Sequence, residues 1–101
     1  MNNIIARYQK NISRIVNDDK IHDDVAKLFK FLKEARDKKK NIFICGNGGS
    51  AGNANHIAND FIYGASRKNK KKFKIESLSS NSSVITCLAN DEGYEHIYSK
   101  Q

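Results

Sequence analysis

The sequence predicts an α/β protein in which two helices precede a parallel strand–helix–strand layer. Apolar residues recur at helical spacing through residues 3–38, a short apolar run follows at 41–45, and a second run alternates at 73–78. This order of elements is typical of a parallel sheet covered by helices. Because two strands cannot form an independently stable doubly wound sheet, we expect the chain to be the N-terminal part of a longer domain.

The first forty residues have the pattern of a helical hairpin. The apolar positions of the two expected helices are Ile4, Ile5, Tyr8, Ile12, Ile15 and Val16, and then Val25, Leu28, Phe29, Leu32 and Ala35. The acidic stretch NDDKIHDD suits the positive end of the second helix dipole, and the basic run RDKKK suits its negative end. We expect residues 1–40 to serve packing or oligomerisation and residues 41–101 to form the α/β part.

A strand, a glycine-rich turn and a helix follow within NIFICGNGGSAGNANHIANDF, residues 41–61. The apolar run at 41–45 is expected to be a strand buried on both faces. The helix is expected to begin near Ser50, with Ser50 or Asn47 as its cap. Farther along, FKIESL at 73–78 predicts a second strand, VITCLA is compatible with a helix or a strand, and YEHIYSKQ begins a helical pattern.

Composition and cysteine usage favour a cytoplasmic protein. The chain has 101 residues, which suits one domain, and a formal charge of +7. Cys45 and Cys87 lie in apolar stretches without a CxxC pair, so we expect buried free thiols in a reducing compartment. No segment approaches the roughly 20 apolar residues that span a bilayer, and the N-terminus lacks the pattern of a signal peptide. We expect no membrane partner.

The turn GNGGS places backbone N–H groups beside the positive end of a helix dipole, which suits an anion. GNGGSA formally fits the dinucleotide fingerprint, but the second strand ends in LSSNSS and offers no acidic residue there for the ribose. A Walker-type P-loop needs Lys after its last glycine, whereas Ser50 follows Gly49. A compact phosphorylated or polyhydroxylated ligand remains, beside the alternative that the glycines only permit a tight turn.

The helix after the turn has a polar stripe of Asn53, His56 and Asp60, roughly opposite its apolar face. His56 and Asp60 are four residues apart, so both side chains can reach one metal ion or one substrate. The same spacing is compatible with the solvated face of an amphipathic helix. The spacing alone leaves both interpretations open.

Two segments resemble markers of a known family. CGNGGSAGNANHIANDF resembles the signature of sugar-isomerase (SIS) domains of the phosphoheptose isomerase type, in which C-G-N-G-G-S precedes a helix with an A-x-H-x-A segment. LANDEGYEHIYSKQ resembles the family's second marker, an N-D segment that opens a helix. The resemblance covers about the first half of a family member. It implies a parallel, flavodoxin- or Rossmann-like three-layer SIS sandwich, of which residues 41–101 would be the N-terminal part.

The resemblance also implies roles for individual residues. The substrate-binding residues would be Asn47, Gly48, Gly49, Ser50, Asp60, Asn90 and Asp91. His56 would be a ligand of a zinc cofactor. Asp60 lies where the family has a Glu that touches the metal and acts as the base, so Asp60 would be both a metal ligand and the catalytic residue. The family's phosphate loop and its later metal ligands would lie beyond residue 101.

The implied function is aldose–ketose isomerisation between sedoheptulose 7-phosphate and a heptose 7-phosphate by a homotetramer. The alternative is a non-catalytic SIS module that binds a sugar phosphate and a protein partner such as a replication initiator. A third possibility is a remnant without activity of its own.

The basic run RKNKKKFK, residues 67–74, has six cations in eight positions. We interpret it as a solvated loop between a helix and a strand. Phe73 is its one aromatic residue, so we expect no nucleic-acid partner. Attraction of an anionic sugar phosphate is a further possibility.

Overall fold

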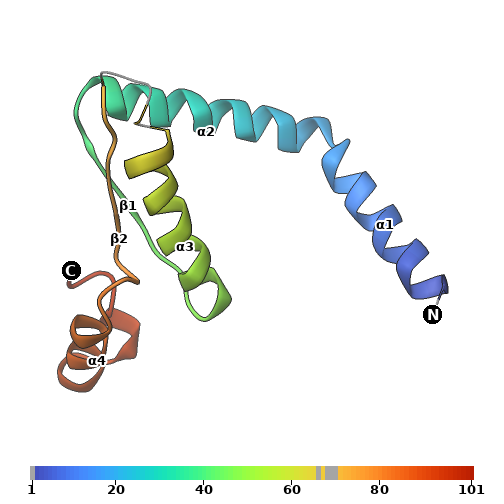
Figure 1. Cartoon of the computed structure of the whole chain (residues 1–101). Helices are drawn as coiled ribbons and strands as arrows, with labels where there is room; N and C mark the ends of the chain where they lie inside the picture. The colour runs from blue at the N-terminus through green and yellow to red at the C-terminus, as the bar shows by residue number, and fades with distance from the viewer. Residues whose placement is uncertain (1, 66, 68–70) are drawn as a thin grey trace. The chain divides into compact units, whose positions relative to one another are not determined.

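The computed structural model describes residues 2–65, 67 and 71–101. Its elements are α1 (Asn2–Val16), α2 (Asp19–Asp37), β1 (Asn41–Ile44), α3 (Gly49–Asn59), η1 (Asp60–Gly64), β2 (Lys74–Ser77), α4 (Ser82–Asp91) and η2 (Tyr94–His96). The order confirms the predicted α/β class (Figure 1). Within the basic run 67–74, Lys68, Asn69 and Lys70 lie outside the described residues. The chain divides into two compact units, Met1–Glu34 and Ala35–Gln101, and the division falls within α2.

The first unit contains α1 and most of α2. Both helices form where the apolar periodicity predicts them. Their exposed large apolar residues include Ile4, Ile5, Tyr8, Ile12, Ile15 and Val16 on α1, and Val25, Leu28 and Phe29 on α2. The packing of residues 1–40 as a hairpin, and their part in oligomerisation, stay predictions.

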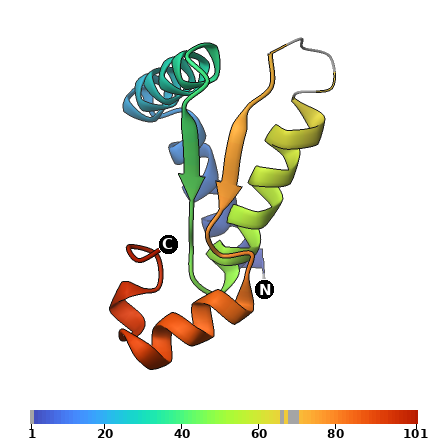
Figure 2. The ribbon, with the colours of Figure 1, turned by 90° about the vertical axis from the view of Figure 1, so that its left-hand side faces the viewer.

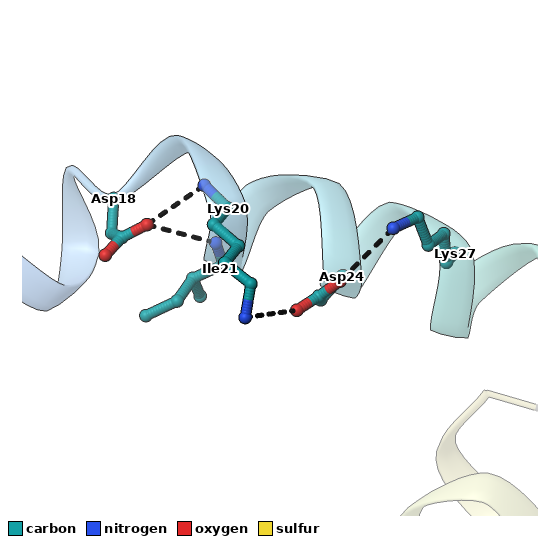
Figure 3. A network of polar contacts seen from close by, with 5 residues as sticks. All are labelled: Asp18, Lys20, Ile21, Asp24 and Lys27. Atoms are coloured by element: carbon teal, nitrogen blue, oxygen red, sulfur yellow. Dashed lines mark hydrogen bonds and ion pairs between the residues drawn. The ribbon is translucent and has the colours of Figure 1, made fainter.

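Asp18 determines where α2 begins. Its Oδ1 accepts hydrogen bonds from the backbone N–H groups of Lys20, at 2.9 Å, and Ile21, at 3.4 Å (Figure 3). The first N–H groups of a helix have no acceptor inside the helix, so this carboxylate satisfies two of them. Asp24 forms exposed ion pairs with Lys20 at 3.9 Å and Lys27 at 3.4 Å, which add little stability.

The second unit is built on a two-stranded parallel sheet. Ile42 of β1 lies opposite Ile75 of β2, and Ile44 lies opposite Ser77. Figure 2 shows the two arrows side by side and pointing the same way. Because alternate side chains of a strand point to the same face, these four residues share one face. Ile75 and Ser77 are buried there, and α3 packs against β2.

The core of this unit is small. Among the described residues, the buried apolar side chains are Ala54, Ala58, Ile75 and Ile97. On the other face of β1, Phe43 is 58% exposed. The expectation of a strand buried on both faces is therefore wrong for this chain: α3 packs against β2 on one face of the sheet, and Phe43 of β1 is exposed.

The two ambiguous segments after β2 are resolved by their backbone. VITCLA is helical and belongs to α4, whose cap Asn81 accepts a hydrogen bond from the N–H of Val84 at 3.2 Å. YEHIYSKQ forms the short 3₁₀ helix η2 followed by turns, instead of a longer helix. Among the described residues, no helix is both long and apolar enough to cross a membrane.

Replacing Asp18 with alanine is expected to fray the first turn of α2 at a cost of about 1 kcal/mol. The measurement is amide hydrogen exchange at Lys20 and Ile21, whose protection should fall roughly fivefold. Asp18→Asn keeps a side-chain acceptor and should retain most of the protection. Equal protection in both variants would show that the carboxylate does not cap the helix.

Candidate functional site

The glycine-rich turn connects the carboxyl end of β1 to the first turn of α3. A Cβ atom on Gly46 would lie 2.4 Å from the carbonyl oxygen of Ser50, so this position accepts only glycine. Gly48 precedes α3 with φ 55° and ψ −123°, a left-handed φ that glycine adopts without a steric penalty. No side chain caps α3, so the expectation that Ser50 or Asn47 caps it is wrong. The backbone of Gly48 occupies the cap position instead.

The turn leaves backbone donors at the helix N-terminus. The N–H of Ser50 donates to the carbonyl of Asn47 at 3.0 Å, and the N–H of Ala51 donates to the carbonyl of Gly48 at 3.1 Å. Within the described part of the chain, the N–H groups of Gly48 and Gly49 therefore remain for a ligand. All four predicted ligand residues of the turn, 47–50, are exposed. This arrangement suits an anion or a polar oxygen.

Two hydroxyl groups hold the turn in place. The N–H of Gly46 donates to Ser79 Oγ at 3.0 Å, and Ser79 Oγ lies 2.9 Å from the Gly46 carbonyl oxygen. The Tyr98 hydroxyl lies within hydrogen-bonding distance of that same carbonyl, of Asn47 Oδ1 at 2.8 Å, and of Ser79 Oγ at 3.2 Å. The segment after α4 therefore returns to the turn and orients the Asn47 amide.

The sequence pattern does not single out Ser79 or Tyr98. Ser79 lies in the polar stretch SSNSS, and Tyr98 lies on the same side of a helical pattern as Tyr94 and Ile97. The one available signal was the position of Ser79 just past β2, because residues there lie at the same sheet edge as the turn after β1.

His56 and Asp60 are brought together by the helix and lie in solvent. His56 Nε2 is 3.3 Å from Asp60 Oδ2, and their side chains are 75% and 59% exposed. His56 lies seven positions beyond Gly49, which is about 10 Å along the helix axis. The structure therefore confirms that the two side chains converge. It also shows that they lie farther along the helix than the glycine turn.

The donor atoms of this pair match the chemistry of zinc in type and spacing. Zinc binds imidazole nitrogen and carboxylate oxygen at about 2.0–2.2 Å in tetrahedral sites, where two donors are separated by roughly 3.4 Å. The observed separation of 3.3 Å is close to that value. Zinc takes four ligands, and no group of three or more His, Cys, Asp or Glu side chains able to hold a metal occurs among the described residues. His56 and Asp60 would supply half of a zinc site.

Asn90 and Asp91 form the C-terminal end of α4. Asn90 Nδ2 donates to Asp91 Oδ1 at 2.7 Å, and the Cys87 thiol donates to Asp91 Oδ2 at 3.3 Å. The Asn90 hydrogen bond, and then that of Cys87, lower the pKa of Asp91. The hydrogen bond to Asp91 and its charge raise the pKa of Cys87. Cys87 and Cys45 are free but exposed, which corrects the expectation of buried thiols.

The chain is an α/β protein whose glycine turn leaves N–H groups open at the carboxyl end of a parallel strand, an arrangement that suits an anion. The family model described as the SIS domain matches residues 7–101. The chain therefore belongs to the SIS domain family.

Several similar proteins are named phosphoheptose isomerase, the type of enzyme that the sequence motifs resemble. Phosphoheptose isomerase 1 of Campylobacter jejuni is 32% identical over 102 residues, covering 100% of this chain and 54% of that protein. Phosphoheptose isomerase of Fusobacterium nucleatum is 34% identical, covering 97% and 51%. The structure of phosphoheptose isomerase from Neisseria gonorrhoeae matches with a TM-score of 0.78 and 26% identity, covering 99% and 51%. The chain spans about half the length of these relatives.

Tyr98→Phe is expected to lower the free energy of unfolding by about 1 kcal/mol, because the hydroxyl that contacts the Gly46 carbonyl is lost. Tyr94→Phe makes the same chemical change at an exposed tyrosine and should leave stability unchanged. Urea unfolding of both variants measures the difference. Equal stabilities would contradict a role for the Tyr98 hydroxyl in holding the turn.

Asp91→Asn is expected to accelerate alkylation of Cys87 by iodoacetamide at pH 8. Asp91 raises the pKa of Cys87 in the folded protein, so removing its charge increases the thiolate fraction, which is the reactive form. Mass spectrometry reports the rate at each thiol. Exposed Cys45 serves as an internal control, and a change of equal size at both thiols would argue against the contact.

Proposed function

We propose that the complete protein is an aldose–ketose isomerase that interconverts sedoheptulose 7-phosphate and a heptose 7-phosphate. One observation supports this most directly: the GNGGS turn is anchored at Gly46 in a chain that matches relatives named phosphoheptose isomerase over nearly all its length. This chain would contribute the N-terminal half of the site. The relatives' names favour the isomerase over the non-catalytic module.

In this proposal the turn binds polar oxygens of the substrate. The N–H groups of Gly48 and Gly49, the Asn47 amide and the Ser50 hydroxyl are the donors. Tyr98 limits the motion of the Asn47 side chain, since the two lie 2.8 Å apart. Asn90 and Asp91 would contact another side of the sugar. The hydrogen bonds from Asn90 and Cys87, which lower the pKa of Asp91, favour its carboxylate form.

Asp60 would act as the base. The reaction moves a carbonyl between C2 and C1 of the open-chain sugar. A carboxylate takes the proton from C1 of the ketose and returns a proton to C2, while the hydroxyl proton passes from O1 to O2. Zn²⁺ held by His56 and Asp60 would supply positive charge beside the oxygens that become negative during the reaction. The i, i+4 convergence of these two exposed side chains supports the assignment.

His56 and Asp60 would be two of the zinc ligands. The other ligands would come from parts of the complete protein that this structure does not describe, or from a neighbouring subunit. We extend the proposal to a cytoplasmic homotetramer. The exposed apolar residues of α1 supply surface for subunit contacts, and the outward His56–Asp60 pair suits a site closed by a second segment.

Asp60→Asn in the full-length protein is expected to lower kcat by about 10²–10⁴, because the amide cannot take a proton. His56→Ala should lower both bound zinc, measured by atomic emission, and the isomerisation rate. Asp24→Asn and His22→Ala make the same chemical changes on α2 and should leave both readouts unchanged. Full activity in His56→Ala with an unchanged zinc content would refute its assignment as a ligand.

A further inference from the structure

Two basic segments that are distant in the sequence meet around one cavity. The cavity has a volume of about 450 Å³ and is lined by Arg36, Asp37, Lys39, Lys71, Lys72 and Lys74. It lies at the amino ends of the strands, because Lys39 shortly precedes β1 and Lys74 begins β2. The glycine turn lies at the opposite end of β1, about 13 Å away along four strand residues. The basic cavity is therefore separate from the glycine turn of the proposed isomerase site.

Asp37 joins the two segments. Its Oδ1 lies 3.2 Å from Arg36 Nη2 and 3.3 Å from Lys71 Nζ. Burial alone would raise the pKa of Asp37, but the hydrogen bonds and charges of Lys71 and Arg36 outweigh burial and lower the pKa. The Arg36 guanidinium lies 5.6 Å from the centroid of the Phe73 ring, and its side chain is 20% exposed. Arg36, Asp37 and Lys71 thus form the frame of the cavity.

Three cations of the lining do not pair with Asp37. Lys39, Lys72 and Lys74 have no acidic partner among the described residues. Lys39 has φ 55°, an unfavourable conformation for a residue with a Cβ atom, and its N–H closes the end of α2 by donating to the Arg36 carbonyl at 3.1 Å. Five cations thus face one carboxylate and the C-terminus of α2, which contributes about half a negative charge. The cavity keeps a clear excess of positive charge.

We propose that this cavity binds a compact oligophosphate, a chain of two or three phosphate groups carried by a nucleotide or by an inorganic polyphosphate. Lysine ammonium groups on flexible stems act as point charges and can follow such a chain without fixed geometry. The volume falls in the range of small-molecule sites.

The aromatic residue beside the cavity does not favour single-stranded nucleic acid. Such strands need exposed aromatic faces on which bases stack. Phe73 is half-buried, lies beneath Arg36, and contacts Phe61 edge to face with ring centroids 4.8 Å apart. The phosphate chain, and not a run of bases, is therefore the ligand that the lining fits.

The test is calorimetric titration of the full-length protein with tripolyphosphate, with ATP and with a single-stranded DNA 20-mer. We expect tripolyphosphate to bind, and K39Q/K72Q/K74Q to weaken its binding by about tenfold or more, with a smaller difference at high salt. K10Q/K20Q/K30Q removes the same charge outside the cavity lining and should change binding less than twofold. Equal affinities for ATP and tripolyphosphate would identify the phosphate chain as the whole ligand, whereas tighter ATP binding would identify a nucleotide.

Four results would overturn the proposal. They are no binding of tripolyphosphate or ATP, equal weakening in both triple variants, displacement of tripolyphosphate by sedoheptulose 7-phosphate, and binding of the DNA alone with the same lysine dependence. The third would place the anion at the glycine turn, and the fourth would identify a nucleic-acid surface. Circular dichroism checks that the variants, all exposed Lys→Gln changes, remain folded.

Discussion

The hydrogen bonds around the Gly46 peptide are the constraint on which the rest of the second unit depends. Gly46 is too close to Ser50 to carry a side chain, and its N–H and carbonyl are both bonded to Ser79. The backbone must therefore turn sharply at the end of β1. Gly48, two residues later, is the cap of α3, which begins at Gly49. The direction of α3 then determines which residues cover the sheet and which face outward.

The same contact links segments that are distant in the sequence. Tyr98 reaches the Gly46 carbonyl from beyond α4, and Gln101 Nε2 donates to the Leu78 carbonyl at 3.1 Å. Ser77 Oγ donates to Asn55 Oδ1 at 2.6 Å, which ties β2 to α3. With so few buried apolar side chains in this unit, polar contacts between half-buried groups define much of its geometry.

Apolar periodicity and turn residues predicted most helices and strands. The features that they predicted wrongly depend on contacts between segments of the chain. The helices α1 and α2 and the strands β1 and β2 follow apolar periods that short windows of sequence reveal. The same periods left VITCLA open between helix and strand and overstated the helix in YEHIYSKQ. The cap of α3 could not be predicted, because Ser50 and Asn47 are good caps in isolation while the close approach at Gly46 places Gly48 at that position. Phe43 was expected to be buried because strand composition does not tell how many faces are covered. The convergence of His56 and Asp60 was predictable from helical spacing, whereas their function was not.

The two ends of the sheet offer anions different chemistry. At the carboxyl end of β1, neutral N–H groups with fixed directions come from the turn, so recognition there depends on geometry. At the amino ends of the strands, Lys39, Lys72 and Lys74 supply mobile charges around Asp37, which is paired with Arg36 and Lys71. Recognition there depends on total charge and weakens with salt. A sugar with one phosphate and several hydroxyls gains most from the first kind of site. A chain of phosphates gains most from the second, and for this reason we propose different ligands for the two ends.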